Sequence, residues 1–390
     1  MARAFSLICT LASFFRNRTK MDSRPRNVRG SSSRPTSPSP LRRDYRGDSD
    51  DSSISLEEWQ SWGTSSQIPT VVKEIVEDLK VIERDMEAQM SFGGLGGKLQ
   101  GNFKAQEDRK HRATYQALVD SEKKLQFFAA RQIACRLLGS RGYLCQKCWL
   151  PLEDCMCSKI MPCDLWNGIR FWLYMHPKDF LRQNNTGKLL WQLFGVQAAT
   201  LCLFGIAEHE EIMWNAFKLA GKSTVWCLYP NQNASTMSVQ DSLCHGSSAV
   251  QSVGNFSVGS TSQTNGGKPI HFVLIDGTWN NSGAMFSRLK EQAKIVWGED
   301  DLSCISLTMG VSTMHKLRPQ PSWDRTCTAA AAIGLLSEIH SLPEFSSYRL
   351  DKRAEAVEDS LEVLLDALTA RRLRMGRSIA RKERHNINIC

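Results

Sequence analysis

Four cysteines of this 390-residue chain lie close together at a spacing suited to metal binding. Cys145, Cys148, Cys155 and Cys157 form the pattern C-x2-C-x6-C-x-C. The two short-spaced pairs let the chain fold back, so that four thiolates could surround Zn²⁺ as a closed tetrahedral shell. Because that shell leaves no position for water, the predicted zinc is structural and not hydrolytic. Buried free thiols or a redox pair are the alternative, and nearby Cys163 does not fit the pairing.

A second candidate site lies in HFVLIDGTWNNSGAMF, residues 271–286. Asp276 ends an apolar strand pattern, Gly277 permits a tight turn, and Trp279 stands where a helical pattern begins. A carboxylate at the end of a strand beside an indole could accept a proton or a hydrogen bond from a base stacked on the ring. The structural alternative makes Asp276 and Thr278 helix caps and Trp279 a core residue.

The elements that must position these residues alternate between strands and helices. Apolar runs predict strands at residues 169–175, 224–229, 271–275 and 304–308, and helical patterns fall near 186–197, 208–220, 284–294 and 326–341. Such alternation favours a mostly parallel sheet covered by helices. Ligands of open parallel sheets bind outside the carboxyl ends of the strands. Residues past those ends, among them His176, Pro230, Asp276 and Gly310, are therefore expected to share one site.

The flanking segments have other compositions. Residues 1–68 hold an Arg/Ser/Pro-rich run and an acidic patch, which predicts a disordered leader, and 1–20 is a candidate organellar targeting segment. Apolar residues at three- and four-residue steps predict one long helix from Thr70 and a second over 105–138, within a helical extension at 69–139. The polar stretch 231–268 predicts a disordered insertion into the domain at 140–345. A basic helix is expected within 346–390.

Composition and charge exclude several classes of protein. With 42% apolar and 23% charged residues the chain is neither wholly disordered nor collagen-like. No apolar run approaches the roughly 18 residues of a membrane span, so no membrane partner is expected. Cysteines scattered outside the cluster favour a reducing compartment, the cytoplasm or the nucleus. The net charge of +9 is concentrated in residues 1–43 and 371–385, and the second run is the best electrostatic candidate for nucleic-acid contact.

Six spaced elements together resemble one family. They are CQKCWLPLEDCMC, HPKD, NNTGKLL, LYP, DGTWNNSGAMF and LRPQPSWDRTCTAAAA, in that order over residues 140–345. They resemble the DTW-domain family of tRNA-uridine aminocarboxypropyltransferases, which is similar to the knotted SPOUT class. The resemblance implies a SPOUT-like, knotted α/β fold, and transfer of the 3-amino-3-carboxypropyl group from S-adenosylmethionine to N3 of a tRNA uridine, leaving methylthioadenosine.

The resemblance also implies roles for individual residues. Asp276, Thr278 and Trp279 become the signature, and Asp276 either orients or deprotonates the uracil imide or binds the amino group of the methionyl moiety. The candidate cofactor-binding residues are Tyr229, Pro230, Gly277, Leu307, Gly310 and Thr328. The candidate tRNA contacts are His176, Lys316, Arg318, Arg371, Arg372 and Arg374, although His176 is equally well explained as a structural residue at a turn.

Two other functions stay open at this stage. Where the family usually has an acid shortly after the threonine of its last element, this chain has Ala329, Ala330 and Ala331. That departure is compatible with a zinc-knuckle RNA-binding or scaffold protein that has a vestigial pocket. A SPOUT-type RNA methyltransferase would share the fold and the cofactor. The oligomeric state is open as well, and a homodimer is one option because knotted relatives often dimerise.

Overall fold

The computed structural model describes residues 54–93, 98–229, 237–245, 268–298, 302–307 and 326–376 of the chain. All of them belong to one compact unit, Asp51–Cys390. The candidate targeting segment 1–20, together with Pro230, Gly310, Lys316 and Arg318, lies outside the described residues, so the predictions made for them stay predictions.

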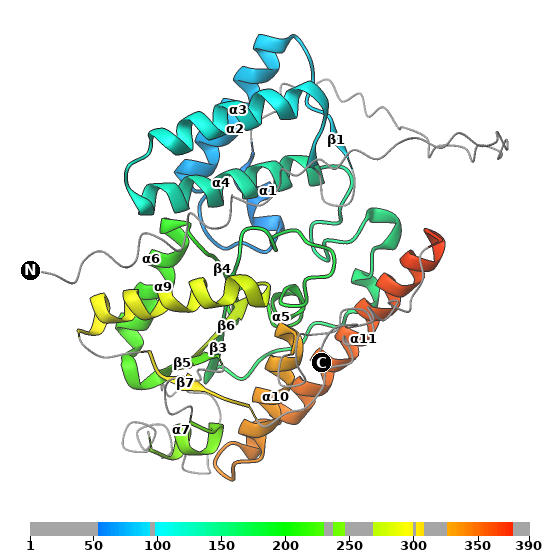
Figure 1. The fold of residues 1–390 in the computed structure, drawn as a ribbon. Coiled ribbons are helices and arrows are strands. Elements are labelled where there is room, and N and C mark those ends of the chain that lie inside the picture. Colours follow the sequence, from blue (N-terminus) through cyan, green and yellow to red (C-terminus); the bar gives the residue numbers. More distant parts are fainter. Residues whose placement is uncertain are drawn as a thin grey trace, which may run out of the picture. The chain divides into compact units, whose positions relative to one another are not determined.

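A five-stranded parallel sheet forms the centre of this unit (Figure 1). Its order is β4-β3-β6-β5-β7. The strands are β3 (Ile169–Met175), β4 (Ala199–Leu203), β5 (Val225–Leu228), β6 (Ile270–Asp276) and β7 (Cys304–Ile305). Along β3, Phe171 and Leu173 enter one apolar core, whereas Trp172 and Tyr174 enter another. Because both faces of the sheet are buried, its strands are nearly continuous apolar runs in the sequence.

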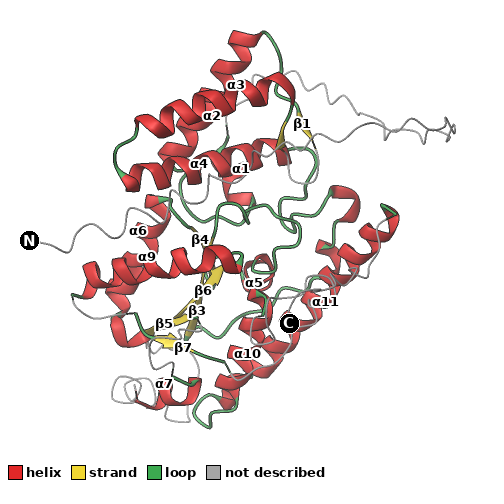
Figure 2. Ribbon diagram, in the orientation of Figure 1, coloured by secondary structure: helices red, strands yellow, loops and turns green. Residues whose placement is uncertain are grey.

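Helices cover both faces of the sheet, as the secondary-structure colouring shows (Figure 2). α6 (Ala207–Ala220) and α9 (Trp279–Trp297) supply the core around Trp172. α5 (Lys188–Phe194), α10 (Thr328–His340) and α11 (Leu350–Arg374) pack in the core around Phe171. The α/β fold class expected from the sequence is thereby confirmed. The knot would depend on connections through 230–236, 246–267 and 308–325, which lie outside the described residues.

The sequence pattern did not predict strand β4, and it predicted a longer strand at β7 than the structure has. The helix predicted near 186–197 ends at Phe194, because Gly195 has φ +80° and its N–H bonds the Trp191 carbonyl, and the chain then turns into β4. The run ATLCL holds alanine and cysteine in place of most of the β-branched and aromatic residues that mark strands. Residues 306–307 follow β7 without strand structure, and the remainder of its predicted range is not described.

The helical extension contains three helices where the sequence pattern predicted two. They are α2 (Thr70–Met86), α3 (Gly101–Ala117) and α4 (Ser121–Ser140), and a two-stranded ribbon, β1 (Phe92–Gly93) with β2 (Lys98–Leu99), lies between α2 and α3. The prediction of one helix over 105–138 is wrong, because Leu118 is extended and the Asp120 side chain accepts a hydrogen bond from Glu122 N at 3.0 Å, capping a new helix. α2 and α4 bury their apolar faces in the core around Phe171, so the extension packs on the α/β domain.

The last part of the predicted disordered leader is ordered. Ser55 caps helix α1 (Leu56–Ser61) by accepting a hydrogen bond from Glu58 N, and Trp59 and Trp62 are almost fully buried. Trp59 Nε1 donates to Ser66 Oγ at 3.2 Å. The prediction of a disordered leader is therefore wrong for residues 54–68. It rested on the average composition of residues 1–68, in which two indoles that the core buries have little weight.

The predicted disordered insertion at 231–268 also contains regular structure. Helix α7 (Val239–His245) lies inside it, with Val239 and Leu243 buried, and Met237 pairs with Ile305. The expectation of a structureless segment is therefore wrong at 237–245. Short 3₁₀ turns elsewhere are Leu152–Asp154, Cys157–Lys159, Lys222–Thr224 and Ser346–Tyr348. Among the helices of the described ranges, none is long and apolar enough to cross a membrane.

Candidate active site

The connections of the sheet change direction between β3 and β6. The chain leaves β3 toward β4 on one side of the pair and leaves β6 toward β7 on the other. At such a point the loops diverge and open a crevice at the carboxyl ends of the strands. A pocket lies there, lined by the last residue of β5 with Tyr229, the end of β6, the last residue of β7 with Ser306 and Leu307, residues 184–186, and the start of α10. Of the residues expected to share one site, Asp276 lines this pocket, His176 is not among its lining residues, and Pro230 and Gly310 lie outside the described residues.

Asp276 is the last residue of β6 and lines this pocket although it is only 6% exposed. Asn185 Nδ2 lies 3.0 Å from Oδ1 and 2.9 Å from Oδ2 of its carboxylate. Asn185 is itself fixed, because its Oδ1 accepts a hydrogen bond from Lys188 N at 3.0 Å. The carboxylate is thus held in one orientation by an amide that the first turn of α5 fixes.

Gly187 allows the loop to approach this carboxylate closely. A Cβ atom at Gly187 would overlap Oδ2 of Asp276 and would lie 3.4 Å from Cγ2 of Thr328. Its backbone is in the ordinary right-handed region, so the need for glycine comes from space and not from φ. Thr186 ties the same loop to α10, since its Oγ1 accepts a hydrogen bond from Ala329 N at 3.3 Å. Segment 184–188 therefore joins β6, α5 and α10 around the pocket.

The signature residues after β6 lie as a turn and a helix start. Trp279 begins α9 and lines the pocket. Thr278 occupies the N-cap position, where its carbonyl accepts from Asn281 N at 2.8 Å, but its side chain makes no capping hydrogen bond, and Thr278 is not among the described residues that line the pocket. Gly277 lines the pocket too, and a Cβ there would lie 3.1 Å from the Met285 sulfur. Trp279 is hence a pocket residue and not the core residue of the structural alternative.

Three more expected cofactor residues line the pocket, namely Tyr229, Leu307 and Thr328. The Tyr229 ring stacks on Phe286 of α9 with centroids 4.2 Å apart and an interplanar angle of 21°. An aromatic wall beside a carboxylate suits a flat heterocycle that carries polar groups at its edge.

His176 is buried and is not among the described residues that line the pocket. It is 6% exposed, its ring stacks on Phe204 at 5.8 Å, and its Nδ1 accepts a hydrogen bond from Lys178 N at 3.1 Å. Burial lowers the pKa of His176 to about 4, so the ring is neutral at pH 7. These contacts favour the structural interpretation of His176 over the phosphate contact.

Lys188 lies between the pocket and the cysteine cluster, a position that sequence reasoning missed. Its side chain is fully buried, and Nζ donates to the Gln183 carbonyl at 2.6 Å and lies 5.9 Å from the Trp149 ring centroid. Burial lowers the pKa of Lys188 to about 7, an effect that the neighbouring Cys148 and Asp276 charges oppose. The available signal was NNTGKLL, a run of turn residues directly before a helix.

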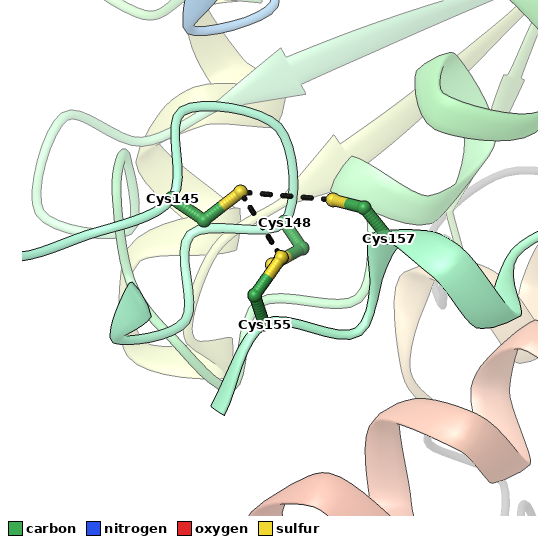
Figure 3. A group of neighbouring side chains, drawn as sticks. All are labelled: Cys145, Cys148, Cys155 and Cys157. Atoms are coloured by element: carbon green, nitrogen blue, oxygen red, sulfur yellow. Dashed lines mark hydrogen bonds between the residues drawn. The ribbon is translucent and has the colours of Figure 1, made fainter. Parts of the chain in front are cut away.

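The four predicted metal ligands come together (Figure 3). Their sulfur atoms all lie within 4.8 Å of one another, with Cys145 at 3.6 Å from Cys157 and 3.5 Å from Cys155, and Cys148 at 3.9 Å from Cys155. Zn–S bonds of about 2.3 Å in a tetrahedron require sulfurs about 3.8 Å apart. The cluster therefore fits a structural zinc ion. Cys163 is not a member of the group, as its spacing predicted.

The knuckle formed by residues 145–157 is anchored in the protein core. Cys145 N donates to the Leu150 carbonyl at 2.8 Å, and Trp149 N donates back to the Cys145 carbonyl at 2.9 Å. Trp149, at φ +55°, is fully buried against Phe180 and Trp191. A metal bound here would stabilise the same core residues that support α5, on which Lys188 and Asn185 depend.

Two arginines of α11 pair with acidic residues of the knuckle, and one of them, Arg371, is buried. Arg371 is 6% exposed, and its guanidinium donates to Asp154 Oδ2 at 3.1 Å and to the Tyr143 hydroxyl at 2.8 Å. Arg374 donates to Asp154 Oδ1 at 2.6 Å and to Glu153 at 3.2 Å. The prediction that Arg371 contacts RNA is thus wrong, since Asp154 neutralises and buries it. Arg374 is also paired, and Arg372 is half-buried.

These features define an α/β domain with a parallel sheet, a pocket at the carboxyl ends of its strands and a four-cysteine knuckle. The family model described as "DTW domain" matches residues 142–373. The chain therefore belongs to the DTW-domain family, as the six sequence elements predicted. Membership is consistent with a tRNA-modifying activity. No solved structure matches the chain.

Proposed function

We propose that this protein transfers the 3-amino-3-carboxypropyl group from S-adenosylmethionine to N3 of a uridine in tRNA. The observation that carries the proposal is the buried, amide-oriented carboxylate of Asp276 beside Trp279 in the pocket of a DTW domain. In this reaction N3 loses its proton and bonds to the methylene carbon next to sulfur, the C–S bond breaks, and methylthioadenosine leaves with the bonding electron pair.

The pocket residues suit the two demands of this reaction. The imide proton must be removed, which a positioned carboxylate can do, and the methylene carbon must be brought in line with N3, which depends on holding both reactants. Trp279 and Tyr229, whose ring stacks on Phe286, offer aromatic surfaces for the uracil and the adenine. Leu307 and Thr328 complete the walls, and Gly277 leaves room for a ligand next to the β6 end.

Two roles for Asp276 fit this pocket. It could orient or deprotonate the uracil imide, or it could bind the ammonium group of the methionyl moiety. Each role needs an ionised carboxylate with a fixed direction, and the contact with Asn185 supplies the direction. The roles differ in their kinetic consequence, because loss of a base lowers kcat, whereas loss of an ammonium ligand weakens donor binding.

The zinc ion is proposed as a structural part of this protein. Cys145, Cys148, Cys155 and Cys157 would hold it, and four thiolates leave no coordination position for a reacting group. When bound, the ion would stabilise the fold of the knuckle. Trp149 and Lys188 would then keep the start of α5 in place.

The experiment that tests the function is a product assay with purified protein, S-adenosylmethionine and an unmodified tRNA transcript. We expect methylthioadenosine as the small product and a uridine whose mass has increased by one aminocarboxypropyl group. S-adenosylhomocysteine with a methylated base would instead indicate an RNA methyltransferase. Donor binding in calorimetry without any modified nucleoside would indicate a scaffold protein with a vestigial pocket.

Asp276→Asn is the matched variant for the same assay. It keeps the size of the side chain and its place beside Asn185 but removes the charge. We expect turnover to fall at least about 100-fold, since general-base assistance contributes about 10²–10⁴. Wild-type turnover of Asp276→Asn would contradict the role of this carboxylate. If kcat falls while calorimetric donor affinity is unchanged, Asp276 acts on the uracil; if affinity falls, it binds the ammonium group.

A further inference from the structure

Arg371 is occupied by Asp154 and Tyr143, so RNA binding by this protein needs other cations, and the described surface offers a cationic site away from α11. The helical extension, which precedes the family-matched segment 142–373, carries one. Its helices α3 and α4 hold both acidic and basic residues. Most of the acidic residues are paired with cations of the protein, whereas several of the basic residues make no ion pair.

The acidic residues of α3 and α4 are paired with cations of the protein. Glu107 and Asp108 both pair with Arg131, and Asp108 also pairs with Lys104. The carboxylate of Glu122 accepts two hydrogen bonds, of 2.6 and 2.7 Å, from the guanidinium of Arg288 in α9. The negative charges of Glu107, Asp108 and Glu122 are therefore compensated by cations, whereas Asp120 is exposed and caps α4.

Several basic residues of the same helices have no such partner. Arg109, Arg112 and Lys123 are exposed, and within the parts of the chain that the structure describes none of them makes an ion pair. Arg109 and Arg112 are three residues apart on one side of α3, and Tyr115 follows after three more. Because Glu107, Asp108 and Glu122 are paired with cations and these three basic residues make no ion pair, this side of the extension has an excess of positive charge.

Two cation–aromatic pairs lie between this side of α3 and the segment after β3 that lines the pocket. Lys124 Nζ lies 5.6 Å from the ring centroid of Tyr115, which is 38% exposed. One turn further along α4, Phe128 receives Lys178 Nζ at 5.2 Å from its ring centroid. Lys178 is exposed, and the next residue, Asp179, lines the pocket and pairs with Arg182.

We propose that this cation–aromatic row, made of Arg112, Tyr115, Lys124, Phe128 and Lys178, binds the RNA strand that delivers the target uridine to the pocket. Alternating cations and aromatic rings suit a single-stranded or splayed segment, because the cations contact phosphates and an exposed ring accepts a stacked base. The inference rests on the proposed function, since it takes RNA as the substrate. RNA binding would give the exposed side of the extension a function in addition to packing on the core.

The test measures affinity for an unmodified tRNA transcript over a series of salt concentrations. For the double variant Lys124→Ala/Lys178→Ala we expect about tenfold weaker binding at low salt and a salt slope reduced by about two, one for each lost phosphate contact. Tyr115→Leu should weaken tRNA binding about tenfold and leave the salt slope unchanged, because this variant loses a stacking ring and no charge. Tyr115→Phe keeps the ring and should bind tRNA as tightly as the wild type does. Calorimetric binding of S-adenosylmethionine should be the same in all variants, which also shows that they are folded.

The matched control is Lys73→Ala/Lys218→Ala, which removes two exposed lysines from α2 and α6, outside the row. If the row variants bind tRNA within twofold of this control, or if poly-glutamate competes as well as tRNA does, the inference is overturned. Failure of the proposed function is distinguishable from this result. In that case the row variants would lose tRNA affinity, while the wild-type protein would yield no aminocarboxypropyl-uridine.

Discussion

Asn185 holds the carboxylate of Asp276 through a single amide group, with Nδ2 at 3.0 Å from one oxygen and 2.9 Å from the other. The two residues are far apart in sequence but meet where the loop before α5 crosses the end of β6. Asn185 Oδ1 accepts the Lys188 N–H, so the amide cannot turn away without breaking the first turn of α5. The direction of the Asp276 carboxylate is thus determined by the segment 184–188.

Removal of the Asn185 amide should reduce turnover because the Asp276 carboxylate loses its fixed direction. We expect Asn185→Ala to lower kcat/KM by about 100-fold, the cost of a misplaced reacting group. Asn185→Asp should place a second carboxylate beside Asp276 and raise the pKa of the pair, because like charges disfavour ionisation. Activity needs ionised Asp276, so its loss on acidification should begin at higher pH in this variant.

The pH–rate profile distinguishes a positioning role of Asn185 from a purely structural one. Asn215→Ala, at an exposed position of α6, is the control and should keep both the rate and the profile. An Asn185→Asp enzyme whose acid limb coincides with that of the wild type would contradict the coupling between Asn185 and Asp276.

A methyl group at Gly187 should displace the same carboxylate. Because a Cβ there overlaps Asp276 Oδ2, Gly187→Ala is expected to lower activity at least about tenfold and the free energy of unfolding by about 1–3 kcal/mol. The control is Gly283→Ala in α9, which is exposed and has only the Tyr229 hydroxyl, at 4.0 Å, near its added Cβ. That change should leave the fold unharmed or stabilise it by up to about 1 kcal/mol. Equal denaturation curves for the two variants would argue against the close approach.

Zinc content should depend on four cysteines and be independent of Cys163. We expect one zinc per chain in the wild type and in Cys163→Ser, and a large loss of zinc together with a lower Tm in Cys148→Ser, because metal affinity and knuckle folding are linked. Metal analysis by mass spectrometry and thermal unfolding measure both effects. Retention of a full zinc equivalent by Cys148→Ser would exclude the proposed ligand set.

Stability should fall on mild acidification because three histidines are buried in neutral form. Burial lowers the pKa of His176, His209 and His271 to about 4 from the ordinary 6.5. In each ring Nδ1 accepts a hydrogen bond, from Lys178 N, Leu203 N and Trp172 Nε1 respectively, which a protonated nitrogen could not do.

The sign follows from proton binding by the unfolded chain. Between about pH 6.5 and 4 the unfolded state takes up protons that the folded state refuses, so the free energy of unfolding is highest above the unfolded pKa and decreases toward the folded pKa. Urea unfolding at pH 7 and pH 5 should reveal the decrease, and His209→Gln should make it smaller. A wild-type protein that is equally stable at both values would refute this account.

Local pattern was sufficient for much of the fold. The strand runs around Phe171, Trp226 and Phe272 were predictable because a strand buried on both faces must be apolar throughout. The spacing of the four cysteines predicted that their thiols come together, because all four lie within one short segment that is rich in turns. The family elements identified the DTW domain, and Asp276 and Trp279 were recognisable because a strand end followed by a helix start is visible in the sequence.

Only the tertiary structure shows which charged side chains are paired and which residues orient the carboxylate of Asp276. Arg371 looks like part of a basic tail until α11 packs on the knuckle and Asp154 buries it. Asn185 and Gly187 look like turn residues until the loop crosses β6 and meets Asp276. Charge and turn propensity are properties of single residues, whereas neutralisation, orientation and steric fit are properties of pairs brought together from distant parts of the chain.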